Sequence, residues 1–457
     1  MSRTKRILVL LVCVGFSAFL SYAIRQRSPK SILMCDFGSI YYGARCAHQH
    51  QDPYAPNTVA SVLTGELASN GWQIPNDPGR AATARTILTV NVNLPTTLFL
   101  LAPISFIPWT VAQNLWMILL AGLLGFAAFL IWDLGAELAP DLWLLLAGFI
   151  LINCEGMLLD GNSAALAVSL CIVASWCFLK HRAETAGAVL LALSLLVKPH
   201  DSGLVWLFFL LAGGVLRKRA LQTAGVAAAL AVCTAIWIAP LSPHWPTELH
   251  NNLTAVSVPG GTSDPSLSGA TNSGAGQIVD LQAVLSILWN HPRFYNLTTW
   301  LIVGALILIW SLATLFRRTS PQRALFALAS ISALSVLPIY HRSNDAKLLL
   351  LAIPACALLW SGKGATRWIA LALTSASIFF TSDMPLAVLG VMTQNIRISA
   401  STLTGKLAII LLHRQAPILL LATGCFYLWI YLRHATPADS PAQTRPRTNA
   451  LAADAAT

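Results

Sequence analysis

Residues 110–132 read TVAQNLWMILLAGLLGFAAFLIW, a run without a single charged side chain. A helix needs about 20 predominantly apolar residues to cross the hydrocarbon core of a bilayer, so this run predicts a transmembrane helix. Apolar windows recur along the chain, near 7–24, 94–108, 142–159, 162–179, 184–197, 203–216, 220–240, 297–316, 323–339, 346–361, 367–381 and 416–432. The pattern predicts an all-α polytopic membrane protein.

The composition supports this class. Of the 457 residues, 56% are hydrophobic and 10% are charged, whereas a soluble domain carries about 25% charged residues. The net charge of +11 does not indicate a nucleic-acid partner, because much of it lies in short clusters beside apolar runs. Cations in such places set the orientation of membrane helices.

The basic clusters at 180–182 and 217–219 constrain the topology. Both lie on the cytoplasmic side, as the positive-inside rule requires, only if one earlier apolar window does not cross. The weakest window is 93–108, which is short and contains three prolines, each lacking a backbone donor. We therefore expect a re-entrant or interfacial element on the outer face there. About twelve spans result, with both termini in the cytoplasm.

The predicted organisation is a single membrane domain over residues 1–434, with 7–24 as an uncleaved first helix. The long outer segments are 25–93 and 241–295, where amphipathic helices and loops are expected. The tail at 435–457 is rich in proline, alanine and threonine, and we expect it to be disordered in the cytoplasm.

Asp36 follows the first apolar run directly, in the stretch CDFGSIYYGARCAH at 35–48. Asp is a favoured N-cap residue, so the carboxylate is interpreted either as a helix cap or as a chemically active group. At helical spacing one face is formed by Phe37, Ile40, Tyr41, Ala44 and His48. Such a face suits a helix lying on the bilayer surface.

Ionisable residues also gather at other predicted outer boundaries. Residues 340–347 read YHRSNDAK between two apolar runs. The stretch is either an ordinary charged turn or a site for a lipid phosphate, which arginine binds well as a bidentate partner. Lys198 and Pro199 end a predicted helix, with His200 and Asp201 directly after it. Asp160 and Asn162 indicate an N-cap turn.

Together these features resemble glycosyltransferase family 87, the polyprenol-phosphate-mannose-dependent mannosyltransferases of the GT-C fold. The resemblance covers roughly residues 7–432. It depends on Asp36 with its tyrosines, Asp52-Pro53-Tyr54, the proline-rich 95–108, Gly161-Asn162 followed by Lys198-Pro199, and Tyr340-His341-Arg342 with Asp345. Such proteins often have Gly-Gln where this chain has Gly161-Asn162.

The resemblance implies a GT-C membrane enzyme that moves a hexose, mannose in that family, from a polyprenyl-phosphate donor to a lipid or glycan acceptor. Asp36 would be the catalytic base of an inverting displacement. The expected substrate-binding residues are Tyr41, Tyr42, Lys198, His200, Tyr340, His341, Arg342, Asp345 and Lys347. No cofactor is expected. A single outer acidic residue argues against a metal-dependent, pyrophosphate-linked donor.

The competing class is a transporter or glycolipid flippase, in which intramembrane charges would line a pathway. Transporters more often place such charges at the bilayer midplane. Here the singled-out groups lie at one predicted face, which favours an enzyme. The expected location is the bacterial plasma membrane, with the active site on the periplasmic or extracellular side.

Overall fold

The computed structural model describes residues 34–70, 78–136, 154–269, 277–383 and 398–434, together with isolated positions elsewhere. These ranges are helical, and their only β feature is one isolated bridge between Ile278 and Arg342. The predicted all-α class is confirmed. Most of the expected first helix at 7–24, half of the window at 142–159, and the tail at 435–457 lie outside the described residues.

Four helices of the described ranges are long and apolar enough to cross a membrane: α6 (Trp109–Gly135), α12 (Gly214–Ile238), α15 (Pro292–Phe316) and α21 (Gln415–Arg433). Shorter helices complete the bundle: α9 (Ala164–Leu179), α10 (Glu184–Val197), α11 (Pro199–Ala212), α16 (Pro321–Leu334), α17 (Ile353–Trp360), α18 (Ala365–Phe380) and α20 (Leu403–His413). A helical membrane protein is confirmed, and the count of about twelve spans stays a prediction.

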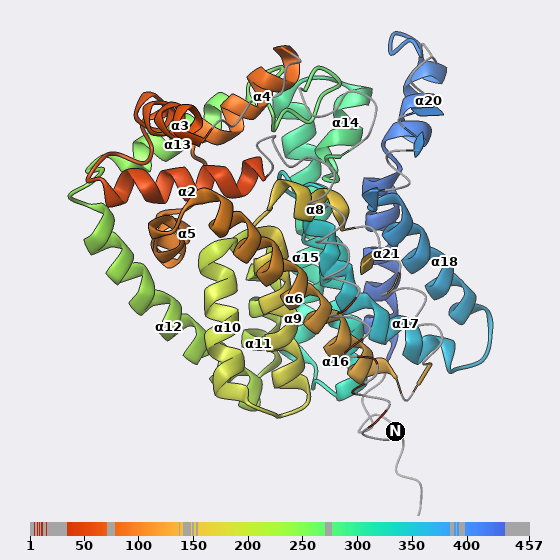
Figure 1. Ribbon diagram of the computed structural model, residues 1–457. Coiled ribbons are helices and arrows are strands. Elements are labelled where there is room, and N and C mark those ends of the chain that lie inside the picture. Colours follow the sequence, from red (N-terminus) through yellow and green to blue (C-terminus); the bar gives the residue numbers. More distant parts are fainter. Residues whose placement is uncertain are drawn as a thin grey trace, which may run out of the picture.

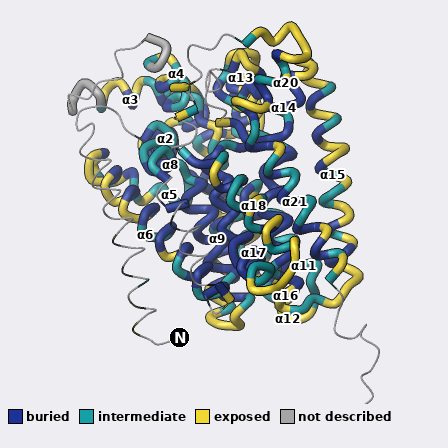
Figure 2. The backbone as a smooth tube through the Cα atoms, turned by 90° about the vertical axis from the view of Figure 1, so that its right-hand side faces the viewer, coloured by how far each residue is buried: buried dark blue, intermediate teal, exposed yellow. Residues whose placement is uncertain are grey.

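Burial within the bundle is uneven (Figure 2). In α6, 61% of the most apolar window is buried inside the protein, but only 17% in α12 and 28% in α15. Large apolar side chains such as Ile236 and Leu301 are accordingly exposed on those two helices. An exposed apolar surface of this extent is unusual in water and suits contact with lipid.

A second group of helices lies across one end of the bundle: α2 (Cys35–His48), α3 (Pro56–Asn70), α4 (Pro78–Thr89) and α13 (Trp245–Ser257). Figure 1 shows α2 and α13 running across the direction of α10 and α12. We call these four helices the end layer. They come from the two segments predicted as long outer loops, 25–93 and 241–295.

The expectation that α2 lies on the bilayer surface is wrong. Four of the five residues assigned to its surface face, all but His48, are buried in the protein, and so are Tyr42 and Gly43. The Phe37 ring stacks on the rings of Trp109 and Trp116, with centroids 5.5 and 4.8 Å apart. Neighbouring helices, including α4, α5 and α6, cover the helix, so its apolar residues meet protein rather than lipid.

The segment 93–108 forms two short elements, α5 (Pro95–Leu101) and the 3₁₀ helix η1 (Ala102–Phe106). Together they span at most about 24 Å even at 3₁₀ rise, less than the roughly 30 Å of the hydrocarbon core. The chain thus forms two short elements here rather than one long helix, as its prolines predict, and the absence of a crossing stays a prediction. α5 contacts α2, α10 and α12, which places it beneath the end layer.

At Gly161 the turn between the short helix α8 (Glu155–Asp160) and α9 packs closely against the end layer. Gly161 follows α8 with φ +63°, a conformation that costs other residues about 1–2 kcal/mol. A Cβ at this position would lie 2.7 Å from the Cβ atom of Phe37. Close approach and positive φ both therefore require glycine.

We expect Gly161→Ala to destabilise the protein by at least about 1–2 kcal/mol from the backbone alone, because the new methyl group also displaces α2. The measurement is the thermal unfolding midpoint of the purified protein. Gly203→Ala in α11 is the matched control, since nothing lies within 4 Å of its added Cβ. Equal midpoints for the two variants would contradict this role of Gly161.

Candidate active site

A cavity of about 380 Å³ lies between the end layer and the bundle. Its wall is assembled from segments far apart in the sequence: Asp36 and Ser39 of α2, Ile87, Val90 and Val92–Leu94 around the end of α4, Asn162 and Ser163, Val197–His200, four residues of α13, Thr262 and Ser263, and Tyr340, Arg342 and Asp345. Of the ten predicted site residues, six line it: Asp36, Lys198, His200, Tyr340, Arg342 and Asp345.

Asp36 is not a helix cap. The N-cap position of α2 is Met34, in a left-handed conformation, and no side chain caps this end. Asp36 instead turns its half-buried carboxylate to the cavity, where Oδ2 accepts a hydrogen bond of 2.6 Å from Nδ2 of Asn162. The cap interpretation is therefore wrong, and the carboxylate is available within the cavity.

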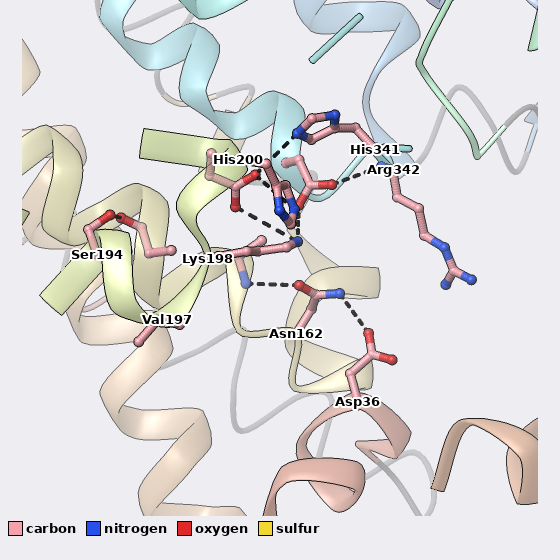
Figure 3. Close-up of polar contacts among 12 residues, drawn as sticks. Asp36, Asn162, Ser194, Val197, Lys198, His200, His341 and Arg342 are labelled. Atoms are coloured by element: carbon pink, nitrogen blue, oxygen red, sulfur yellow. Dashed lines mark hydrogen bonds and ion pairs between the residues drawn. The ribbon is translucent and has the colours of Figure 1, made fainter. Parts of the chain in front are cut away.

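Asn162 holds this carboxylate from a fixed position (Figure 3). Its Oδ1 accepts a hydrogen bond of 2.8 Å from the backbone N–H of Ala164. Because an N–H can only donate, that bond decides which end of the amide faces Asp36. The indole of Trp116 donates to the carbonyl of Gly161 at 2.9 Å, which anchors the same turn. The predicted turn is present, but its N-cap residue is Ser163, which has no side-chain cap bond. Asn162 precedes that residue, and its side chain bonds both the N–H of Ala164 and the cavity carboxylate.

Asp160 is a second carboxylate beside Asp36, and sequence reasoning did not pair the two. It is the last residue of α8 rather than an N-cap. Burial and then the charge of Asp36 raise the pKa of Asp160 to about 7, against the opposing charge of Arg342. The expectation of a single outer acidic residue is thus not met, although Asp160 does not line the cavity.

Lys198 occupies the break between α10 and α11, where Pro199 begins the second helix, as its sequence predicts. At this break the backbone carbonyl of Val197 accepts a hydrogen bond of 2.9 Å from the Thr97 hydroxyl of α5. The Lys198 ammonium pairs with Oδ1 of Asp345 and lies 3.7 Å from Oδ2 of Asp201. Burial lowers the pKa of Lys198, but these two carboxylates outweigh it and raise that pKa.

The stretch from Tyr340 to Asp345 is an anchored turn rather than an ordinary charged one. Asp345 begins the 3₁₀ helix η2 (Asp345–Ala352), and its Oδ2 accepts the backbone N–H of Arg342 at 2.9 Å. The Arg342 guanidinium donates to the Tyr340 hydroxyl and, at 3.2 Å, to the carbonyl of Thr262. It points away from His341 (Figure 3) and lines the cavity.

Four predicted site residues do not line the cavity: Tyr41, Tyr42, His341 and Lys347. The Tyr41 hydroxyl donates to the carbonyl of Ile107 at 2.8 Å within the aromatic core. The Lys347 ammonium donates to the carbonyl of Thr381 at 3.2 Å. His341 is fully buried, and its Nε2 lies 3.6 Å from Oδ1 of Asp201.

Sequence reasoning also missed the asparagines around the cavity wall, of which Asn93 lines the cavity and Asn91 and Asn252 lie behind it. The side-chain amide of Asn93 donates to the Ser39 hydroxyl at 3.2 Å, and the backbone carbonyl of Asn93 accepts a hydrogen bond from the Tyr54 hydroxyl at 2.8 Å. Asn252 of α13 donates to the carbonyls of Tyr54 and Asn91, both at 3.0 Å. Asp52-Pro53-Tyr54 thus anchors the wall, which is a structural use of a motif noted only for its resemblance.

A family model described as Glycosyltransferase family 87 matches residues 92–339, more than half of the chain. The match includes Asn162, Lys198 and His200, and it ends just before Tyr340. Asp36 lies outside it. No curated protein and no solved structure matches the chain.

Proposed function

The chain belongs to glycosyltransferase family 87, and we propose that it moves a hexose, mannose first among the candidates, from a polyprenyl-phosphate donor to a hydroxyl of a lipid or glycan. We further propose a GT-C architecture of about twelve spans, with the cavity on the outer side of a bacterial plasma membrane. One observation carries the proposal: a carboxylate, a lysine and an arginine from distant segments line one cavity at the end of an apolar bundle.

In this proposal Asp36 accepts the proton of the acceptor hydroxyl as that oxygen bonds to the anomeric carbon. The bond from that carbon to the phosphate oxygen breaks in the same step, and the polyprenyl phosphate leaves with the electron pair. Arg342 and Lys198 stabilise the charge that develops on the phosphate. A single displacement of this kind inverts the anomeric centre and needs one base.

The apolar part of the cavity wall suits a lipid-linked donor. It is formed by apolar residues of α13, Leu249, Leu253 and Val256, with Ile87 and Val90 near the end of α4. A polyprenyl chain is apolar throughout, whereas its phosphate needs cations. The cavity is lined by both kinds of surface, which supports a phosphate-linked lipid over a free sugar.

Membranes containing the overproduced protein, supplied with polyprenyl phosphates carrying different radiolabelled hexoses, test the proposal. We expect label to leave one of these lipids and appear in a larger product. Membranes without the protein are the control. Labelled lipid that only changes leaflet, with its sugar still attached, would support the flippase alternative instead.

We expect Asn162→Ala to lower kcat by about 10- to 100-fold, because a hydrogen bond to a charged group is worth about 1.5–3 kcal/mol. The KM for the donor should change little, since the amide orients the base and need not touch the phosphate. Steady-state kinetics separate the two effects. Asn251→Ala, on the exposed side of α13, is the control. An unchanged kcat for Asn162→Ala would contradict the positioning role.

Arg342→Ala should raise the KM for the donor by about 10- to 100-fold through loss of charged hydrogen bonds to the phosphate. The KM for the acceptor should change much less. Arg342→Lys, which keeps the charge without the planar fork, is expected to recover part of the loss. Arg217→Ala, at an exposed position of α12, is the control. Equal effects on both substrates would argue against phosphate contact.

A further inference from the structure

Beside the cavity, two imidazole nitrogens converge on one carboxylate oxygen. Nε2 of His200 lies 3.7 Å and Nε2 of His341 lies 3.6 Å from Oδ1 of Asp201. Asp201 and His341 are 1% and 0% exposed, whereas His200 also faces the cavity. Figure 3 shows His200 and His341 on the same side of Lys198. None of the transfer chemistry proposed above uses His341 or Asp201.

The atoms that meet here lack hydrogen-bond partners. Among the described residues, Nε2 of His341 and both carboxylate oxygens of Asp201 make no hydrogen bond. Nδ1 of His341 lies 2.9 Å from the carbonyl oxygen of Ile339, and a carbonyl can only accept, so Nδ1 carries the hydrogen. In the neutral ring Nε2 therefore presents a lone pair to the oxygen lone pairs of Asp201.

A shared proton does not resolve this arrangement, because N···O hydrogen bonds measure about 2.7–3.2 Å. A metal ion does. Nitrogen and oxygen ligands of zinc lie about 2.0–2.2 Å from the ion, so two of them at a tetrahedral angle are about 3.3–3.6 Å apart. The separations of 3.6 and 3.7 Å are close to this value.

We propose that His200, Asp201 and His341 bind a divalent transition-metal ion, with zinc as the best match to two imidazoles and a carboxylate. The bond from Nδ1 of His341 to a backbone carbonyl is the usual second contact of a metal-ligating histidine. Asp345 contributes an atom to the same cluster, whose four ligand atoms all lie within 4.8 Å of one another.

The Lys198 ammonium does not occupy the position proposed for the metal ion. It pairs with Asp345 and approaches Oδ2 of Asp201, which leaves Oδ1 for the ion. The oxygens of Asp345 already accept from Lys198 and from the backbone of Arg342. The proposed ion thus has three protein ligands and one open position, as in catalytic rather than structural zinc sites.

The charges suggest what occupies the open position. Two buried carboxylates face one ammonium, so a divalent ion leaves the cluster with a net positive charge. Since His200 lines the cavity, a phosphate oxygen of the donor suits the fourth position. This last step depends on the proposed sugar transfer, whereas the metal site itself does not. It also departs from the expectation of a metal-free site.

The test uses the full chain, purified through a tag without histidine, stripped with chelator and then dialysed against Zn²⁺ or Co²⁺. We expect about one ion per chain by elemental analysis and, for Co²⁺, visible absorption bands of a four-coordinate ion. Zn²⁺ should also raise the unfolding midpoint of the wild-type protein. His341→Ala and Asp201→Asn should lose all three signals, and His244→Ala, at an exposed histidine, should keep them.

Wild-type protein that retains no ion and shows no Zn²⁺-dependent shift would overturn the proposal, whether or not the variants fold. An ion retained equally by His341→Ala would overturn the assignment to these residues. Sugar transfer at full rate by metal-free protein would remove the role in donor binding. Conversely, bound metal without transfer from any donor would refute the proposed function and leave the metal site in place.

Discussion

Asp36→Asn is expected to lower the rate of sugar transfer by about 10²- to 10⁴-fold, the usual contribution of a general base. The amide has the shape of the carboxylate, and its oxygen can still accept the hydrogen bond from Asn162. It cannot accept the proton of the acceptor hydroxyl. The protein should therefore insert, fold and bind donor normally while transfer is lost. Single-turnover rates with labelled donor measure the effect.

The neighbouring carboxylate is the matched control for this prediction. Asp160 interacts with the charge of Asp36 but does not line the cavity, so Asp160→Asn should retain most of the transfer rate. A near wild-type rate for Asp36→Asn would exclude it as the base. A large loss for Asp160→Asn together with a small one for Asp36→Asn would move the role to Asp160.

Lys198→Met is expected to cause the largest loss of stability, about 3–5 kcal/mol, because breaking a buried ion pair leaves its partner's charge unpaired. The Lys198 side chain is 17% exposed and that of its partner Asp345 is 4% exposed. Asp201, also close to the ammonium, would lose a favourable contact as well. The thermal unfolding midpoint of the purified protein should fall by several degrees.

A second substitution separates charge pairing from general disruption. Lys198→Met combined with Asp345→Asn removes both charges of the pair, and we expect it to recover part of the lost stability. Lys218→Met, at an exposed position of α12, should melt like the wild type. If the double variant is no more stable than Lys198→Met, the ion pair is not the cause.

Several features of this fold could be predicted from the sequence because each depends on local chemistry. Uninterrupted apolar runs predict helices, and Pro199 predicts the break after Val197, since proline cannot continue the preceding helix. The prolines of 93–108 predict short elements for the same reason. Topology then placed Asp36, Lys198 and Arg342 on one face, and all three line one cavity.

What could not be predicted depends on how helices pack. Periodicity assigns one buried face to α2, but packing covers nearly all of it, so the spacing of Tyr41 and Tyr42 did not reveal that both belong to the core. The bond between Asn162 and Asp36 joins residues that are 126 positions apart. A polar side chain in a turn predicts a local bond to the backbone, such as that of the Asn162 Oδ1 atom. Only the tertiary structure shows that the Nδ2 atom of the same side chain bonds Asp36.

The same limitation explains the buried histidine. His341 and Arg342 are neighbours in a polar stretch, and sequence reasoning assigned both to a phosphate. Their side chains diverge, so Arg342 reaches the cavity and His341 meets Asp201. Direction along an irregular turn follows no simple period, whereas it does along a helix or strand.

The most direct measurement is the anomeric configuration of the sugar before and after transfer. The purified protein, reconstituted in liposomes with polyprenyl phosphate carrying a ¹³C-labelled hexose and an acceptor, would be followed by NMR of the anomeric carbon. A single displacement assisted by Asp36 predicts a product with inverted configuration and none from Asp36→Asn. A retained configuration, or a sugar that never leaves its lipid, would contradict the account.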